Sequence, residues 1–432
     1  MLSNIATRGG FGLAAVTLAV CLQPHAASAS TLTPLYSFCA ADNCSDGNEP
    51  VNGAVRDAAG NIYTSTLIDG VSNGGDVIEL KRSHNKYKYQ FMYRFCSQAN
   101  CLDGETPVGD LIVDVNGNVY GATQYGGKHG GGAIFKLTPN AKQTKWKLSL
   151  LYNFCLKANC TDGAYPLAGL TYQGAASGLP YDGTSPMFGT ASAAGGANGG
   201  VAFMLTPTRK NAKEKVIYNF CSQASCADGT SPQGALIADA AGNLYGTTHG
   251  GGSTNSGTAF ELSPAAGSSY AQSVLYSFCQ QANCADGTQP HDPLVMDSNG
   301  NLFGTTEQGG SNNHGVVFKI QPNGARSTQT VLYTFCPTGT CSDGYDPLGG
   351  LSIDANGDLL GTTHWGGILF GTIFKIHDTG ESVLYEFCQQ SNCADGAGPF
   401  SGVVLDGSGN MYGTTITGGA GDGGGTIWEF KP

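Results

Sequence analysis

Short apolar runs separated by glycine-containing turns recur along the chain, and no segment keeps the period of an amphipathic helix. The runs are rich in β-branched, aromatic and aliphatic residues and partly alternate with polar positions, which is typical of β-strands. Asn-Gly, Asp-Gly and Gly-Gly pairs bound them, as expected for tight hairpins. The pattern therefore predicts an all-β fold built from hairpins.

The runs form seven repeats of about 57 residues, and each repeat predicts four strands. The sixth repeat shows the order: Leu332-Tyr-Thr-Phe335, a cysteine loop, then apolar segments at 351–354 and 358–363 and finally 371–376. Four antiparallel strands in a unit of this size are typical of a propeller blade. We therefore expect a single domain with seven blades.

The two ends of the chain predict how the ring closes. Leu35–Phe38 has the fourth-strand phrase alone, and residues 425–430 end on the third-strand phrase. Pairing them completes the last blade and leaves no exposed edge, whereas an open solenoid would need caps. We predict one seven-bladed propeller over residues 30–432, with the fourth strand of the last blade at 35–38 and blades at about 51–95, 108–154, 167–220, 233–278, 291–335, 348–387 and 400–431.

The first 29 residues are predicted to be a signal peptide. Arg8 precedes an apolar run over residues 11–22, and Ala27-Ser28-Ala29 offers a cleavage site. The run is too short to span a bilayer, and no later stretch is long enough. We therefore expect a secreted protein, extracellular or periplasmic. Lipid anchoring at Cys21 is the less favoured alternative, because Val20 is larger than the residue that usually precedes a lipidated cysteine.

Fourteen of the fifteen cysteines form seven pairs of identical spacing, one in each repeat. Paired cysteines behind an export signal indicate disulfides formed in an oxidising compartment. A zinc site would need four ligands, and each repeat offers two cysteines without a regularly spaced histidine. We predict seven structural disulfides: Cys39–Cys44, Cys96–Cys101, Cys155–Cys160, Cys221–Cys226, Cys279–Cys284, Cys336–Cys341 and Cys388–Cys393.

The chain is acidic, with 21 basic and 32 acidic side chains and a formal net charge of −11. Removal of the signal segment takes away Arg8 and no acid, which leaves −12. This charge argues against nucleic acid or an anionic membrane surface as the partner. It also counts against a polyanionic substrate, unless a metal ion or a local basic patch compensates.

The repeat phrases predict the place of each strand in its blade. The strand after the repeated proline is expected innermost, the Gly-Thr-Thr strand second, and the Leu-Tyr-x-Phe strand outermost. The disulfide loop and the glycine-rich loop after the second strand then lie on one face. Residues 172–186 replace the usual turn of the third repeat, which predicts an insertion on the opposite face.

An Asp-Gly pair follows every disulfide loop, and we expect its carboxylate to cap a turn amide. Seven equivalent calcium or sugar sites are the alternative. The Asp-x-x-Gly-Asn segments, such as residues 297–301, lack the full spacing of a calcium loop and predict hairpin turns. The aspartates after the disulfides are Asp46, Asp103, Asp162, Asp228, Asp286, Asp343 and Asp395.

Candidate functional residues are those that break the sevenfold symmetry. The position after Gly-Thr-Thr reads, around the ring, Leu67, Gln124, Ser192, His249, Glu307, His364 and Ile416. The fifth repeat also carries His291 and Asp292 before its innermost strand. We predict a catalytic cluster on the disulfide-loop face of blades four to six, made of His249, Asp292, Glu307 and His364.

Two imidazoles and two carboxylates suit either metal binding or general acid–base catalysis. The predicted ligands of a divalent metal (Ca²⁺, Mn²⁺ or Zn²⁺) are His249, Glu307 and His364; no other cofactor is expected. The predicted substrate-binding residues are Asp110, Gln124, Tyr125, His291 and Trp365. The rings of Tyr125 and Trp365 suit stacking on a sugar. The alternative is that these are exposed loop positions that tolerate any polar residue.

The segments 236–248 and 315–320 (Gly-Val-Val-Phe-Lys-Ile) resemble the GloVer tandem-repeat family of exported bacterial β-propeller proteins. The resemblance covers essentially the whole chain after the signal segment. The resemblance implies a β-propeller fold and export from the cytoplasm, and it implies no particular activity, because the family has no general one. Two departures are the paired cysteines, which are additional to the repeat pattern, and the end at Lys431-Pro432 without the sorting anchor that members often carry.

We expect a monomeric secreted propeller that acts on an extracellular polysaccharide as a lyase or a glycoside hydrolase. A uronate polymer would need a metal-assisted lyase, whereas a neutral glycan suits hydrolysis by Glu307 with Asp292 or Asp110. One alternative is a non-catalytic, lectin-like propeller that binds carbohydrate or a cell surface, although no aromatic–arginine pair repeats between blades. A structural envelope protein is the other.

Overall fold

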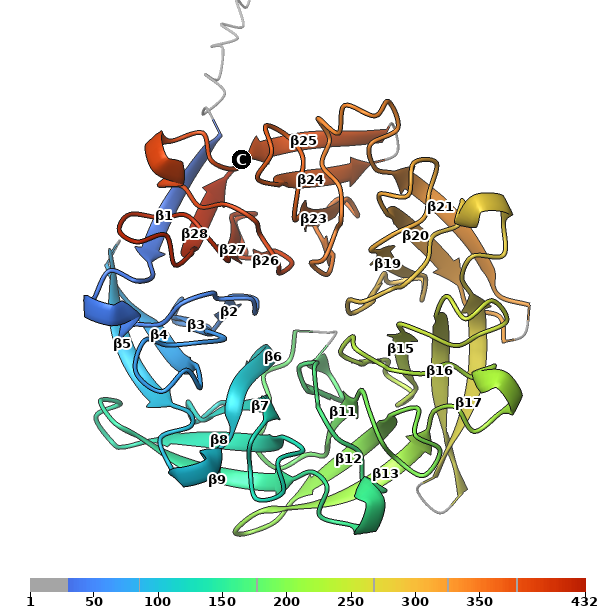
Figure 1. Cartoon of the computed structure of the whole chain (residues 1–432), viewed down its shortest axis with the longest axis horizontal. Helices are drawn as coiled ribbons and strands as arrows, with labels where there is room; N and C mark the ends of the chain where they lie inside the picture. Colours follow the sequence, from blue (N-terminus) through green and yellow to red (C-terminus); the bar gives the residue numbers. More distant parts are fainter. Residues whose placement is uncertain (1–29, 85, 176–177, 267–268, 325, 378–379) are drawn as a thin grey trace, which may run out of the picture.

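The structure, a computed structural model, describes residues 30–432 apart from 85, 176–177, 267–268, 325 and 378–379. Seven four-stranded antiparallel sheets stand around a central axis in Figure 1. This confirms the predicted seven-bladed propeller. The predicted signal peptide and its Cys21 lie outside the described residues. Among the described helices, none is long and apolar enough to cross a membrane.

Each blade runs outwards from the axis in the predicted strand order. The innermost strands are β2 (Val55–Arg56), β6 (Glu105–Val113), β10 (Thr171–Tyr172), β14 (Ile237–Ala238), β18 (Val295–Met296), β22 (Ser352–Ile353) and β26 (Val404–Leu405). The second strands are β3 (Ile62–Ser65), β7 (Val119–Tyr125), β11 (Met187–Ala191), β15 (Leu244–Thr248), β19 (Leu302–Thr306), β23 (Leu359–Thr363) and β27 (Met411–Thr415).

The third and fourth strands form the longer, outer half of each blade. The third strands are β4 (Asp76–Ser83), β8 (Ala133–Pro139), β12 (Val201–Pro207), β16 (Thr258–Ala265), β20 (Val316–Gln321), β24 (Thr372–His377) and β28 (Thr426–Lys431). The outermost strands are β5 (Lys86–Arg94), β9 (Trp146–Asn153), β13 (Ala212–Asn219), β17 (Ser269–Ser277), β21 (Thr328–Thr334), β25 (Gly380–Glu386) and β1 (Thr31–Ser37).

Strand β1 closes the ring by pairing antiparallel with β28, so the last blade contains both ends of the described chain. The predicted closure is confirmed. The strand begins at Thr31, four residues before the predicted Leu35. It is longer because Leu32 is buried with Trp428 and Phe430 in the last blade, which extends the pairing towards the N-terminus.

Glycine recurs in the second strand because an aromatic ring of the third strand lies across it. A Cβ atom on Gly246 would lie 2.8 Å from the Phe260 ring. The Phe260 ring in turn meets Phe220, which directly follows the outermost strand β13 of the preceding blade, with 4.9 Å between ring centroids. In the first blade Thr64 and Ile78 take the places of the glycine and the aromatic ring. The same contacts therefore hold one blade together and join it to its neighbour.

The first threonine of Gly-Thr-Thr also ties each of several blades to the next. The Oγ1 atom of Thr247 donates to the Asp292 carbonyl at 3.3 Å, and that of Thr362 donates to Ser401 at 2.8 Å. The equivalent bond from Thr414 to the Asn52 carbonyl, at 3.0 Å, joins the seventh blade to the first. Hydrogen bonds near the axis thus complete the ring.

All seven predicted disulfides are formed. The aspartate after each loop caps it, as predicted: Asp228 accepts hydrogen bonds from the Ser222 and Gln223 amides and, at 2.7 Å, from the Tyr218 hydroxyl. Six loops contain a short 3-10 helix: η1 (Asp42–Cys44), η2 (Ala99–Cys101), η3 (Ala158–Cys160), η5 (Ala224–Cys226), η7 (Ala282–Cys284) and η8 (Ser391–Cys393).

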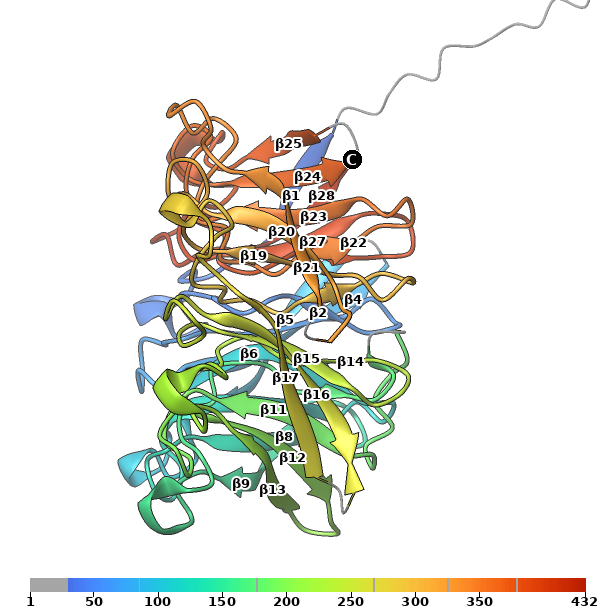
Figure 2. The same cartoon turned by 90° about the vertical axis from the view of Figure 1, so that its right-hand side faces the viewer.

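The disulfide loops and the glycine-rich loops lie on one face, as predicted. The Thr230 amide, after one disulfide loop, donates to the carbonyl of Gly250 in the glycine-rich loop at 2.9 Å. Figure 2 shows the short helices gathered on this face, which we call the disulfide face. The third-repeat insertion joins β10 to β11 on the opposite face, where the Val115 amide of the second blade donates to Tyr181.

Candidate functional site

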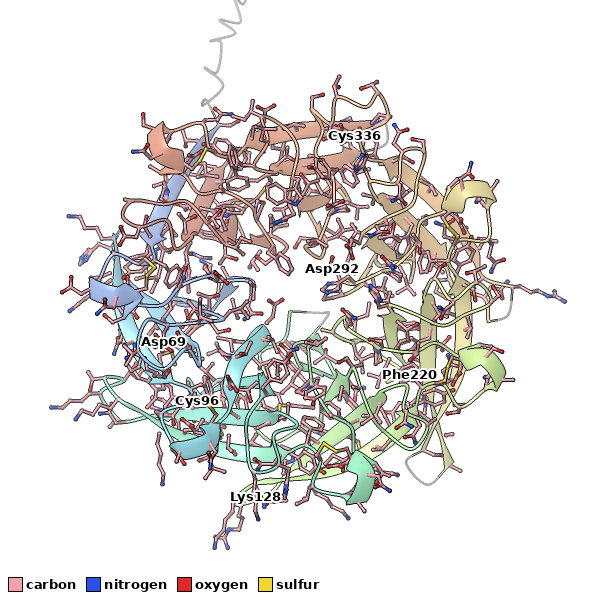
Figure 3. The ribbon with its side chains drawn as sticks, viewed as in Figure 1. Asp69, Cys96, Lys128, Phe220, Asp292 and Cys336 are labelled. Carbon is pink, nitrogen blue, oxygen red and sulfur yellow. A yellow bond between two sulfur atoms is a disulfide. The ribbon has the colours of Figure 1, made fainter. Side chains whose placement is uncertain are left out.

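A cavity of about 640 Å³ occupies the axis of the ring, and all seven blades contribute to its wall. In each blade the wall is built from the residues that follow the repeated proline. Most of them are apolar or glycine, such as Val108, Leu167 and Gly350. The fifth blade differs, because His291 and Asp292 stand there. Figure 3 shows Asp292 close to the centre of the ring.

His291 and Asp292 form a hydrogen-bonded pair. His291 Nδ1 lies 3.4 Å from Asp292 Oδ1, and the Thr305 hydroxyl of β19 donates to Oδ2 at 3.3 Å. Burial by itself lowers the pKa of His291, but the hydrogen bond and charge of Asp292, together with Glu307, outweigh it and raise the pKa. Burial also raises the pKa of Asp292, and its contacts with His291 and Thr305 offset this only in part. The pair therefore tends to hold a proton.

Asp110 is a second carboxylate in the wall of the cavity. It sits where β6 shifts its pairing register with β7, and the Gly53 amide of the first blade donates to its Oδ1 at 2.9 Å. The surrounding protein raises the pKa of Asp110, and that amide bond partly offsets the shift. The charge of Asp110 contributes to the raised pKa of Asp292. Both carboxylates therefore act on the same cavity.

The mouth of this cavity on the disulfide face has a regular backbone. The residue before the repeated proline has a positive φ, for example 55° at Ser231 and 56° at Gln289. Its carbonyl accepts the amide of the residue after Gly-Thr-Thr: His249 donates to Ser231 at 3.0 Å and Glu307 to Gln289 at 3.2 Å. In each blade this hydrogen bond therefore holds the residue before the proline and the residue after Gly-Thr-Thr at the mouth.

His249, His291 and Glu307 share one electrostatic environment at this mouth. Burial lowers the pKa of His249, the nearby His291 lowers it further, and Glu307 partly opposes both effects. The same Glu307 helps to raise the pKa of His291. The pKa values of these two neighbouring imidazoles are thus shifted in opposite directions, which favours a neutral His249 beside a protonated His291.

His364 lies apart from this group. Its Nδ1 donates to the Pro399 carbonyl at 3.3 Å, and its ring packs edge-on against Trp365 and against Phe400 of the seventh blade. The residue is 8% exposed, and burial lowers its pKa. The structure therefore brings together His249, His291, Asp292 and Glu307, and it turns His364 towards the next blade.

The predicted metal ligands do not assemble. Within the described part of the chain, the group whose three ligand atoms lie within 4.8 Å of one another is His314, Cys336 and Cys341. Both of its sulfur atoms belong to one disulfide. His249, Glu307 and His364 present no such set, so a divalent ion does not fit these residues as they are arranged.

Exposed aromatic rings stand around the mouth. Tyr125 is 41% exposed, receives a hydrogen bond from Gln124 Nε2 at 3.0 Å, and meets Tyr165 of the third blade edge-on. Trp365 of the sixth blade is also 41% exposed. Tyr165, which we did not predict, is 39% exposed and is the positive-φ residue of its blade.

Asp346 and His314 are two further residues that the sequence analysis missed. The Asp346 amide donates to the His314 carbonyl at 3.3 Å, and burial raises the pKa of Asp346, with Glu307 adding to it and His314 opposing it. A signal was available at the position of His314. It is glycine in four blades, whereas blades four to six carry Ser256, His314 and Phe370.

Solved structures similar to this chain are propellers at low identity. The β-propeller domain of Cps50 (Swd1) from Myceliophteria thermophila has a TM-score of 0.54 and 8% identity, over 93% of this chain and 99% of that one. A Bacteroides uniformis protein described as a 6-phosphogluconolactonase has a TM-score of 0.46 and 13% identity, over 78% and 84%. At these identities the likeness concerns the fold alone.

The extracellular domain of a protein described as a hybrid two-component system, from B. thetaiotaomicron, has a TM-score of 0.48 and 14% identity. The match covers 92% of this chain and 41% of that one, so this chain spans less than half of its length. A comparison with the curated proteins found no match.

The family comparison is more direct. The Gloeobacter/Verrucomicrobia repeat matches twice, at residues 24–186 and 174–368. These segments contain most of the repeats and the candidate site at the mouth. Because the two matches cover more than half of the chain, this protein belongs to the Gloeobacter/Verrucomicrobia repeat family.

Proposed function

We propose that this protein is an exported propeller that binds an extracellular glycan across the disulfide face and hydrolyses it at the mouth of the axial cavity. The observation that carries the proposal is the group of His249, His291 and Glu307: His291 helps to lower the pKa of His249, and Glu307 helps to raise that of His291. Seven disulfides and the predicted signal peptide support export.

The charge around the mouth favours a neutral glycan over a uronate polymer. Asp110, Asp292, Glu307 and Asp346 lie in or beside the cavity, and its lining residues include neither lysine nor arginine. A polyanionic chain would be repelled there, and the described residues around the cavity offer no metal site to compensate. Hydrolysis therefore fits the described residues better than metal-assisted lyase chemistry.

The opposite pKa shifts suit a general acid and a general base. Protonated His291, held by Asp292, would donate its proton to the glycosidic oxygen as the bond from that oxygen to the anomeric carbon breaks. His249, with Glu307 beside it, would accept a proton from the water whose oxygen bonds to that carbon. One water is consumed, and the proton balance closes between the two imidazoles.

The exposed rings at the mouth would position the glycan. Tyr125 and Tyr165 lie together on blades two and three, and Trp365 lies on blade six. Flat aromatic faces stack on the apolar faces of sugar rings. A linear chain that contacts both sides would cross the axis over His291.

The release of reducing ends from neutral and acidic polysaccharides tests this proposal. We expect activity on a neutral glycan, a loss of about 100-fold or more in kcat for His291→Gln, and no loss for Ser192→Ala, which alters the blade-three counterpart of His249. Unchanged release by His291→Gln would contradict the mechanism. Binding without any release would instead establish the lectin-like function and overturn hydrolysis.

A further inference from the structure

We propose that a basic arc on the outer edge of blades one to three docks this protein on an anionic polysaccharide. The basic arc consists of the hairpins between the third and fourth strands, at residues 81–88, 136–147 and 209–215. Each hairpin carries four lysine or arginine residues, so the arc holds 12 of the chain's 21. This surface is independent of the mouth and of the proposed hydrolysis.

The basic arc is opposite in charge to the rest of the molecule. Its three segments contain one acid, Glu214, and have a net charge of +11, whereas the whole chain has −11. The equivalent hairpins of blades four to six, at 261–273, 319–330 and 375–382, together contain three lysine or arginine residues, Lys319, Arg326 and Lys375. The charge is therefore a local feature of three blades and not a property of the repeat.

The three hairpins lie next to one another in space. Strand β5 packs beside β9, and β9 packs beside β13. Gln90 Nε2 of the first blade donates to the Gln143 carbonyl at the turn of the second, at 2.8 Å. The hairpins occupy the left and lower edge of the ring in Figure 1, and nitrogen-tipped side chains project outwards there in Figure 3.

Five lysines of the basic arc are available to a partner. Lys86, Lys88, Lys142, Lys145 and Lys147 are exposed, and among the described residues none of them lies within 4.0 Å of a carboxylate. The single acid does not neutralise them, because Glu214 is 9% exposed and Lys157 Nζ binds it at 2.8 Å.

The composition of the arc favours a polysaccharide over a nucleic acid. Ten of its twelve cations are lysine, a point charge that suits scattered carboxylates or sulfates, whereas arginine suits bidentate phosphate and base contacts. The half-buried rings of Tyr87 and Trp146 lie between the lysines and offer faces for sugars. The disulfides indicate a compartment outside the cytosol, where envelope polysaccharides are the abundant polyanions.

The position of the arc leaves the mouth free. Turns between third and fourth strands lie on the face opposite the disulfide loops, because each strand reverses direction. A protein docked by this edge would present the disulfide face away from the polymer that holds it. The arc also supplies the local positive charge that a −11 chain needs to bind a polyanion at all.

Binding to immobilised polygalacturonate at low and at about 200 mM salt tests the proposal. We expect salt-sensitive binding by the full exported chain. The variant K142Q/K145Q/K147Q should bind at least about tenfold more weakly at low salt, because each cation that lies against a polyanion adds to the binding free energy. The matched control Q321E/R326E removes the same three units of charge from blade five and should bind as the unaltered protein does.

If both variants weaken binding to polygalacturonate equally, only the total charge of the protein matters, and the proposal that the basic arc is the docking surface is overturned. Absence of binding to polygalacturonate at low salt would do the same. Duplex DNA and vesicles with anionic lipid are the competing ligands. Tighter binding to either of them than to polygalacturonate would replace the polysaccharide with that partner class.

Discussion

At the scale of single residues, the surroundings decide what each titratable side chain does. His249 and His291 are the same residue type on neighbouring blades, yet burial lowers the pKa of one and Asp292 raises that of the other. Asp228 is fully buried, yet two amides and a tyrosine hydroxyl hold its carboxylate as the cap of a loop. A histidine or an aspartate in this sequence therefore has no fixed role until its partners are known.

Glu381 in β25 gives a pH-dependent prediction. Burial raises its pKa to about 7, Asp343 adds to the shift, and its Oε1 atom has no hydrogen-bond partner among the described residues. A carboxyl whose pKa is higher in the folded than in the unfolded protein favours folding while protonated, so stability falls as the pH rises from about 4.5 to about 7. We expect Glu381→Gln to raise Tm at about pH 8 and to leave it unchanged near pH 4.

Scanning calorimetry across this pH range measures the effect. The control is Asp422→Asn, which neutralises an exposed acid and should shift Tm little at any pH. Parallel pH curves for Glu381→Gln and the unaltered protein would contradict the assignment of the buried carboxyl.

At the scale of strands, each blade repeats one packing solution with one exception. Six blades lay an aromatic ring across a glycine of the second strand, and the first blade uses Thr64 and Ile78. The exception shows that the two positions are coupled. A larger residue in the second strand requires a smaller one in the third.

The coupling predicts the outcome of exchanging these pairs. Gly246→Thr should destabilise the fourth blade by about 1–3 kcal/mol, because its Cβ would overlap the Phe260 ring. Adding Phe260→Ile recreates the pair of the first blade and should recover part of the loss. Chemical denaturation of both variants measures the difference, and a double variant that is no more stable than Gly246→Thr would disprove the coupling.

At the scale of the whole molecule, closure of the ring depends on the first described strand. Leu32 faces the core of the last blade and is 8% exposed, whereas its neighbour Thr33 is exposed. We expect Leu32→Asp to lower Tm by several degrees, because it buries a charge without a partner. Thr33→Asp is the matched control and should change Tm little. Equal Tm values for both variants would show that β1 does not hold the ring closed.

The sequence alone predicted the strands, the seven blades, the closure and the seven disulfides. These follow from local patterns repeated seven times, so each copy supports the others. It also predicted from the repeat position that His249 and Glu307 share a face, and equivalent backbone hydrogen bonds, to Ser231 and to Gln289, hold the two residues there. The sequence is sufficient to predict where a residue lies when its neighbours in the same repeat determine that location.

Only the tertiary structure decided how side chains from different blades meet. His364 occupies the same ring position as His249, but Phe400 and the Pro399 carbonyl of the next blade turn it away. Asp346 and His314 come from different blades and meet through a backbone hydrogen bond between those blades. The three basic hairpins stand far apart in sequence, and only the curvature of the ring places them on one edge. The repeat thus determines the scaffold, whereas packing between blades determines the surfaces on which the proposed functions depend.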